Sequence, residues 1–354
     1  MSFRDVERSF FDLYWQIDPV AATQAGVPGH DDRYGRYGNA ALAPHLAALK
    51  SIGSTLEQTA VADREEEIDR TALLNEIRVM LRRYEKIKPQ ATNPEFWLSH
   101  LLGGLHHLLL SADRTPAEKA VAAIGRLADI PAFLDDLRAT LEEPVRVFVE
   151  TAVRMTEGGR LLVKELATAL GSQSPMHAAR LTSAAEEAHK ALHSFDANLE
   201  RWLEMGSEQF AIGEDAFNFL LHYQHALRDT APELWRYGLR LKEEIEQDLV
   251  RLATRLDGRP WPELVDKLRG DHPSPAELVD AYAKEMARAR DFVAARKLCP
   301  IRGFPRRSRS ASCATTVATN WRRRRYTKAI LVTTYSSRLP RSRPRTCARI
   351  SGRR

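Results

Sequence analysis

The segment LTSAAEEAHKALHSFDANLERW, residues 181–202, decides the fold class of this chain. Its apolar side chains recur at alternating steps of four and three residues: Leu181, Ala185, Ala188, Leu192, Phe195, Leu199 and Trp202. This spacing places them on one stripe of an α-helix, with Glu186, Lys190 and Glu200 elsewhere on its surface. Because the stripe covers only about three heptads, it favours a helix packed in a bundle over a free coiled coil.

The same period recurs along 73–84 and along Leu234, Gly238, Leu241, Ile245, Leu249 and Leu252. Helix starts are marked by a hydroxyl, a proline and a glutamate at Thr115–Glu118 and Ser274–Glu277, and again at Thr230–Glu233 with the proline shifted by one. There the hydroxyl and the glutamate satisfy free amide groups at the first turn. An irregular loop is expected over 26–39, and no run before residue 297 alternates as a strand does. The sequence therefore predicts an all-α multi-helix bundle of roughly nine or ten helices.

Charge is divided unevenly between residues 1–297 and residues 298–354. The second segment holds 15 Arg, one Lys and no acidic residue, so it carries +16. The remaining 37 basic residues face all 47 acidic ones, so residues 1–297 carry −10. Few large apolar groups accompany the arginines, which predicts a disordered basic tail over 298–354 after a helical domain over 1–297.

Cysteine and apolar residues narrow the class of protein further. All three cysteines lie in 298–354, so residues 1–297 can hold neither a disulfide framework nor a thiolate metal site. The N-terminus is charged over residues 1–18 and does not read as a secretory signal. The longest uncharged run, 96–112, is too short to span a bilayer and predicts a buried helix. We expect a cytoplasmic protein without a membrane partner.

Histidine pairs are the first candidates for chemistry. His222 and His225 stand three apart and could share a helix face and a metal, but zinc would need a third protein ligand and no HExxH motif occurs. The adjacent His106 and His107 point about 100° apart on a helix and are poorly placed to chelate one ion. Hydrogen-bonded structural histidines are therefore the expectation at both places.

Other motifs also favour structural roles. Asp63 and the run Glu65–Glu67 suit the positive end of a helix dipole. Gly103 and Gly104 lie in an apolar run without a GxGxxG or Walker pattern, which indicates close helix packing. From the residues we expect no catalytic, cofactor-binding or metal site.

A basic cluster with flanking aromatic residues, Trp321–Tyr326, is the best candidate for nucleic-acid contact. Its four consecutive arginines can neutralise phosphates, and its aromatic rings can stack on bases. The signal is nonspecific, so any binding of nucleic acid is expected to occur through charge alone.

Several segments together resemble the DUF885 family of helical bacterial proteins regarded as zinc metallopeptidase-like. The resemblance is carried, in order along residues 10–297, by Asp18–Gly26, Asn93–Trp97, Gly213–His222, Thr230–Leu234 and Asp271–Val293. It implies the N-terminal half of a helical metallopeptidase-like fold, a peptide-like substrate and zinc for a complete member. The family's zinc motif, His-Glu followed by Pro-Gly-His, lies downstream; here no His follows His272 and no Glu follows Glu285. No zinc ligand or base can therefore be carried over to this chain.

Three functions follow as hypotheses. The first is an inactive, truncated member of this hydrolase family, whose residues from 298 onward are a frameshifted reading of a GC-rich gene. The second is a helical scaffold whose basic arm binds nucleic acid or other polyanions. The third is a helical interaction protein that reuses the scaffold without zinc. If the first holds, helices meant to pack on the missing part should expose apolar faces.

Overall fold

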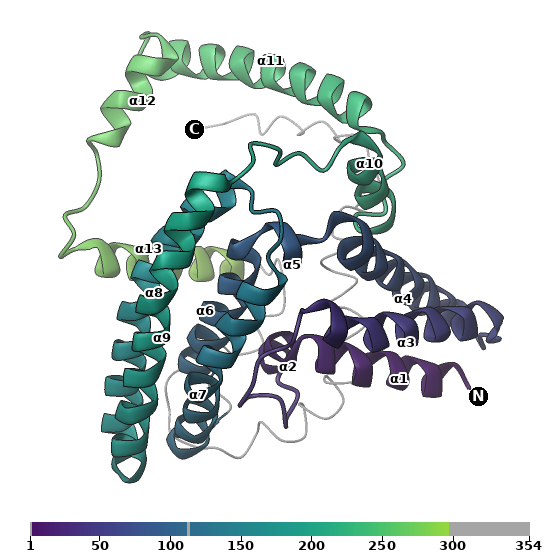
Figure 1. Ribbon diagram of the computed structural model, residues 1–354. Helices are drawn as coiled ribbons and strands as arrows, with labels where there is room; N and C mark the ends of the chain where they lie inside the picture. The colour runs from purple at the N-terminus through teal and green to yellow at the C-terminus, as the bar shows by residue number, and fades with distance from the viewer. Residues whose placement is uncertain (1, 112–113, 297–354) are drawn as a thin grey trace. The chain divides into compact units, whose positions relative to one another are not determined.

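The chain is almost entirely helical in a computed structural model that describes residues 2–111 and 114–296 (Figure 1). Within these residues there are thirteen α-helices and no strand, apart from an isolated bridge between Val145 and Ser207. The predicted all-α fold class is confirmed. The helices outnumber the roughly nine or ten expected because helices as short as α5 show no apolar period. The predicted boundary at Lys297 and the predicted tail lie outside the described residues.

Two compact units divide the described residues, one ending at Arg228 and the other beginning at Asp229. The first contains α1 Phe3–Ile17, α2 Pro19–Ala25, α3 Asn39–Gln58, α4 Arg64–Arg82, the π-helical turn η1 Arg83–Ile87, α5 Pro89–Thr92, α6 Pro94–Leu110, α7 Pro116–Thr140, α8 Arg146–Gln173, the 3₁₀ turn η2 Pro175–His177, α9 Ala178–Met205 and α10 Glu214–Tyr223. The second contains α11 Ala231–Leu256, α12 Trp261–Arg269 and α13 Leu278–Ala295.

The core of the first unit is built from long helices lying side by side. α9 packs along α8 and against α7, while α6 packs against both α7 and α8 (Figure 1). All seven members of the α9 stripe, from Leu181 to Trp202, are buried, as predicted. The uncharged run forms α6 and buries Trp97, Leu101 and Leu105 completely. Helices α1, α3 and α4 form a second layer, and α2 connects it to α6.

Helix starts follow the predicted capping chemistry at two of three places. The Glu118 carboxylate accepts hydrogen bonds from the amide and hydroxyl of Thr115 at 2.7 Å, and the Glu233 carboxylate does the same for Thr230. At Ser274 the same bonds to Glu277 form, but α13 begins only at Leu278. The predicted start there was wrong, because residues 275–277 form a turn that these bonds close without a helix.

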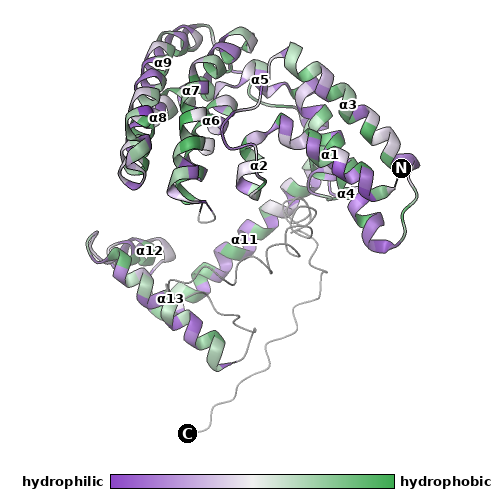
Figure 2. Cartoon of the chain, turned by 90° about the horizontal axis from the view of Figure 1, so that it is seen from below, coloured by the Kyte–Doolittle hydropathy of each residue, from purple (hydrophilic) through white to green (hydrophobic). Residues whose placement is uncertain are grey.

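The second unit buries little of its apolar surface. In α11, only Ala253 is buried, while Leu241, Ile245 and Leu252 of the predicted stripe are 38–48% exposed. No residue of α12 or α13 is buried. Figure 2 shows apolar and polar residues mixed along α11 and α13. None of the described helices combines the length and apolar character needed to cross a bilayer.

Candidate functional site

The predicted histidine pair does not share a helix. α10 ends at Tyr223, and the amides of Gln224 and His225 both donate to the carbonyl of Leu220. Ala226 then takes the left-handed conformation with φ +53°, which turns the chain away from the helix axis. His225 therefore lies beyond the helix, and the expectation that it could share a helix face with His222 was wrong.

The zinc ion that the resemblance implies for a complete family member would need a set of protein ligands. A protein zinc site needs at least three side-chain ligands within reach of one ion. No three His, Cys, Asp or Glu side chains of residues 2–111 and 114–296 gather closely enough to hold a metal. The described residues do not fit a zinc ion. The cysteines and the Trp321–Tyr326 cluster lie outside the described residues.

The Gly103–Gly104 pair lies within α6, as close packing requires. A Cβ added at Gly104 would lie 2.9 Å from Tyr34 and 3.1 Å from Arg126 and from Val20. Gly103 has no such neighbour within 4 Å. The packing prediction is confirmed at Gly104 alone, and that close approach leads to the most unusual charge of the core.

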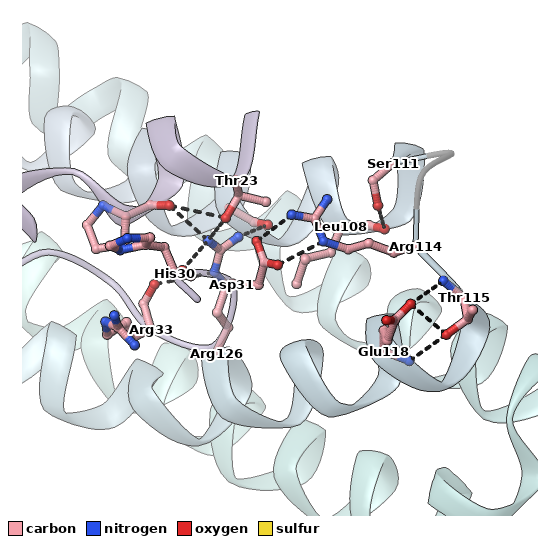
Figure 3. Close-up of polar contacts among 12 residues, drawn as sticks. Thr23, His30, Asp31, Arg33, Leu108, Ser111, Arg114, Thr115, Glu118 and Arg126 are labelled. Atoms are coloured by element: carbon pink, nitrogen blue, oxygen red, sulfur yellow. Dashed lines mark hydrogen bonds and ion pairs between the residues drawn. The ribbon is translucent and has the colours of Figure 1, made fainter. Parts of the chain in front are cut away.

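Arg126, on α7, is a fully buried arginine whose guanidinium donates to carbonyl and hydroxyl oxygens of the described residues. Its guanidinium donates to the Gly104 carbonyl at 2.5 Å and to the Thr23 hydroxyl at 2.6 Å (Figure 3). Longer bonds reach the carbonyls of His30 and Arg33 in the 26–38 loop. These bonds join α2, α6 and the loop, so Arg126 organises the core and is not exposed to a ligand.

Further contacts with carboxylate groups hold the same loop against Arg114 and α7. Asp31 forms a two-bond ion pair with Arg114 at 2.8 and 2.9 Å (Figure 3). On α7, Asp129 accepts the Tyr34 amide and Asp136 accepts the Tyr37 amide. The predicted irregular loop is confirmed, and its shape is fixed by one face of α7.

A half-buried ion pair joins the start of α2 to α6. His100 Nε2 lies 3.6 Å from Asp18 Oδ2, while His100 Nδ1 is 2.7 Å from the Phe96 carbonyl. Burial opposes both charges, but their mutual attraction and the backbone hydrogen bonds outweigh it, so the pKa of Asp18 is lowered and that of His100 is raised. Asp18 also caps α2 by accepting the Ala21 amide.

A carboxylate and an imidazole are the groups of an acid–base couple, but neither Asp18 nor His100 lines the cavity described below. General acid–base groups must reach a proton on a bound substrate. The rings of Phe96 and Tyr37 lie beside His100, with centroids 4.6 and 5.1 Å from its own. Tyr37 is fully buried, and burial raises its pKa well above the ordinary value. We therefore assign Asp18 and His100 to the packing of α2 on α6.

A cavity of about 450 Å³ lies elsewhere in the first unit. Arg82 ends α4, Lys86 lies in η1, and both line the cavity with Asn93 at the start of α6. Phe148 of α8 and Phe210 of the segment before α10 supply apolar surface. Among the described residues that line this cavity there is no Asp or Glu.

Backbone contacts fix the cavity walls. Val145 donates its amide to the Thr92 carbonyl, which holds the start of α8 against α5. At the wall formed by the segment before α10, the Arg146 amide donates a hydrogen bond to the Ser207 carbonyl at 2.9 Å. Gly206 permits this approach, because a Cβ there would lie 3.1 Å from both the Cα and the backbone nitrogen of Arg146.

Sequence reasoning missed Arg126, the Asp18–His100 pair and the cavity. Only Arg126 left a signal, since it interrupts the apolar series Ala123, Ile130 and Phe133 on one face of α7. The ion pair and the cavity join residues far apart in the chain, which no local pattern reveals.

Comparison with known proteins completes the description. The family model described as "Bacterial protein of unknown function (DUF885)" matches residues 19–316. No curated protein matches the chain. A solved structure described as "a putative lipoprotein of unknown function from Shewanella oneidensis" is 20% identical, with a TM-score of 0.65 over 88% of this chain and 62% of its own. The chain thus spans about three fifths of that protein, and the likeness concerns the fold.

Proposed function

Since the chain belongs to the DUF885 family, we propose that its described helices are the non-catalytic scaffold of a zinc-dependent, peptidase-like hydrolase. In this proposal the chain has no zinc site of its own and does not hydrolyse peptides. The zinc and the peptide-like substrate belong to the complete family member.

The observation that carries this proposal is the apolar stripe of α11. It has the helical spacing of the α9 stripe, yet Leu241, Ile245 and Leu252 are exposed whereas the α9 stripe is buried. Amphipathic helices draw most of their stability from packing an apolar face. Three successive helices with a single buried residue among them therefore suit a fold that continues beyond them.

Two further observations support it. The related solved structure is longer, since the match covers only 62% of that chain. The residues described here bring no three metal ligands together, and no His follows His272. In a complete member, ligands and a general base would come from sequence that follows α13.

The experiment is to sequence the coding DNA past codon 297 and translate its other two frames. We expect one frame to encode acidic residues and a His-Glu…Pro-Gly-His segment. The chain restored in that frame should hydrolyse peptides with zinc, and the present chain should not. If both other frames close within a few dozen codons, or if the present chain itself cleaves peptides, the proposal fails.

A second candidate function is nonspecific binding of polyanions by residues 298–354. It is favoured by the 15 arginines and the lack of acidic residues in that segment. Binding to a single-stranded oligonucleotide should weaken steeply with salt and show no sequence preference. Equal binding by a chain ending at residue 297 would remove this function.

The cytoplasm remains the proposed location. The acidic charge of residues 1–297 and their lack of cysteine favour it. Fractionation of the native cells tests the location directly, and recovery with the membrane fraction would oppose it.

A further inference from the structure

The cavity between α4, α6, α8 and the segment before α10 has one cationic end. Arg82 and Lys86 stand four residues apart, at the end of α4 and in the following turn. The guanidinium carbon of Arg82 lies 5.1 Å from the Phe219 ring centroid, and its buried Nε has no hydrogen-bond partner among the described residues. Arg82 and Lys86 both carry a positive charge and both line the cavity, so this end of it favours an anion.

Nearby carboxylates are engaged elsewhere. Glu85 pairs with Lys50 at 2.8 Å, and Glu208 pairs with Arg146 at 2.9 Å. Neither glutamate lines the cavity. The described residues that line the cavity therefore leave the positive charge of Arg82 and Lys86 without a neutralising carboxylate.

A neutral donor lies at the same cavity. The side-chain oxygen of Asn93 accepts the Phe96 amide at 3.1 Å as the cap of α6. Its amino group keeps two hydrogens that can be donated. Arg82, Lys86 and Asn93 together provide the donors that a carboxylate accepts.

The rest of the lining is suited to an apolar group. Phe148 and Ile87 are half-buried, while Phe210 is 65% and Ile212 44% exposed. Phe210 and Ile212 follow the bridge at Ser207, so backbone bonds hold their segment near α8. Large apolar side chains held at a cavity are typical of small-molecule sites, whose volumes run from about 300 to 1,000 Å³.

We propose that this cavity binds a carboxylate attached to an apolar group. The carboxylate contacts Arg82, Lys86 and Asn93, and the apolar group covers Phe148 and Phe210. The terminal residue of a peptide and a short fatty acid share this chemistry. The site uses no metal, so it stands independently of the proposed hydrolase scaffold.

Two carboxylates and their neutral counterparts test the proposal. Binding of N-acetyl-phenylalanine and of octanoate to the full chain is measured by calorimetry, beside N-acetyl-phenylalaninamide and octanamide. We expect at least one acid to bind with a Kd below about 1 mM and its amide to bind about tenfold more weakly or worse. Binding of the first acid identifies a peptide terminus as the source, and binding of octanoate identifies a fatty acid.

Two variants locate the binding. Lys86→Gln removes an exposed charge from the lining, while Lys88→Gln removes an exposed charge that does not line the cavity. We expect about a tenfold loss of affinity for the first and none for the second, with unchanged circular dichroism. The proposal is overturned if neither acid binds, if acid and amide bind equally, or if both variants bind like the parent chain.

Discussion

The adjacent glycines of α6 give a test of the packing around Arg126. An alanine methyl at Gly103 would meet nothing within 4 Å, whereas at Gly104 it would lie 2.9–3.1 Å from Tyr34, Arg126 and Val20. Alanine gains up to about 1 kcal/mol over glycine inside a helix. Gly103→Ala should therefore raise the free energy of unfolding by roughly 0.5–1 kcal/mol.

At Gly104 the same gain is opposed by overpacking. Forcing a methyl into a filled core costs typically about 1–3 kcal/mol, and Tyr34 and Arg126 are themselves buried and hydrogen-bonded. The expected net effect of Gly104→Ala is a loss of about 1–2 kcal/mol.

The two variants serve as each other's control, because they make the same chemical change one residue apart. Urea unfolding of the full chain, followed by far-UV circular dichroism, should separate them by about 2 kcal/mol in opposite directions from the parent. Equal stabilisation by both alanines would show that α6 does not approach Tyr34 and Arg126 as described.

Four further variants test other contacts by the same unfolding assay. On α8, Gly158→Ala should stabilise by roughly 0.5–1 kcal/mol, and Gly159→Ala should be near neutral because its Cβ meets only the movable end of Leu102 at 2.9 Å; a large loss at Gly159 would contradict this. Burial, with the charge of Glu7, raises the pKa of Asp69 to about 6, so its ionisation destabilises the fold as pH rises from its unfolded value near 4 through 6. Asp69→Asn should accordingly stabilise by about 1 kcal/mol at pH 7 and much less at pH 4, and an equal effect at both would refute the shift. Asp18→Asn keeps a helix cap but loses the ion pair with His100. Because the pKa of Asp18 is lowered and that of His100 raised, the pair's contribution is present between their unfolded values, about pH 4 to 6.5. It is lost as pH falls through the folded Asp18 pKa and as pH rises through the folded His100 pKa. A destabilisation by Asp18→Asn that does not diminish as pH rises through the folded pKa of His100 would oppose this assignment.

Local patterns predicted the helices well because helical period and capping are local properties. The stripe of residues 181–202 and the box at Thr115 each lie within one element, and both are confirmed. The spacing of apolar residues does not predict whether another element packs over the stripe. The stripe along α11 has the same spacing and remains largely exposed, because burial depends on what packs against the helix.

The candidate metal ligands and the cavity were harder to predict from the sequence than the helices. The His222–His225 spacing assumed a continuous helix, and the left-handed Ala226 that follows the helix end left no glycine or proline as a warning. The cavity gathers Lys86, Phe148 and Phe210, of which the first and the last are more than 120 residues apart in the sequence. Such sites arise from tertiary packing, which sequence spacing does not contain.

The zinc content of the purified chain shows whether its helices hold a metal site. The full chain, purified without chelators and dialysed against zinc-containing and then zinc-free buffer, is analysed for bound metal by mass spectrometry. We expect zinc far below one ion per chain, because the described residues gather no three ligands and no His follows His272. One tightly held zinc per chain would contradict this expectation.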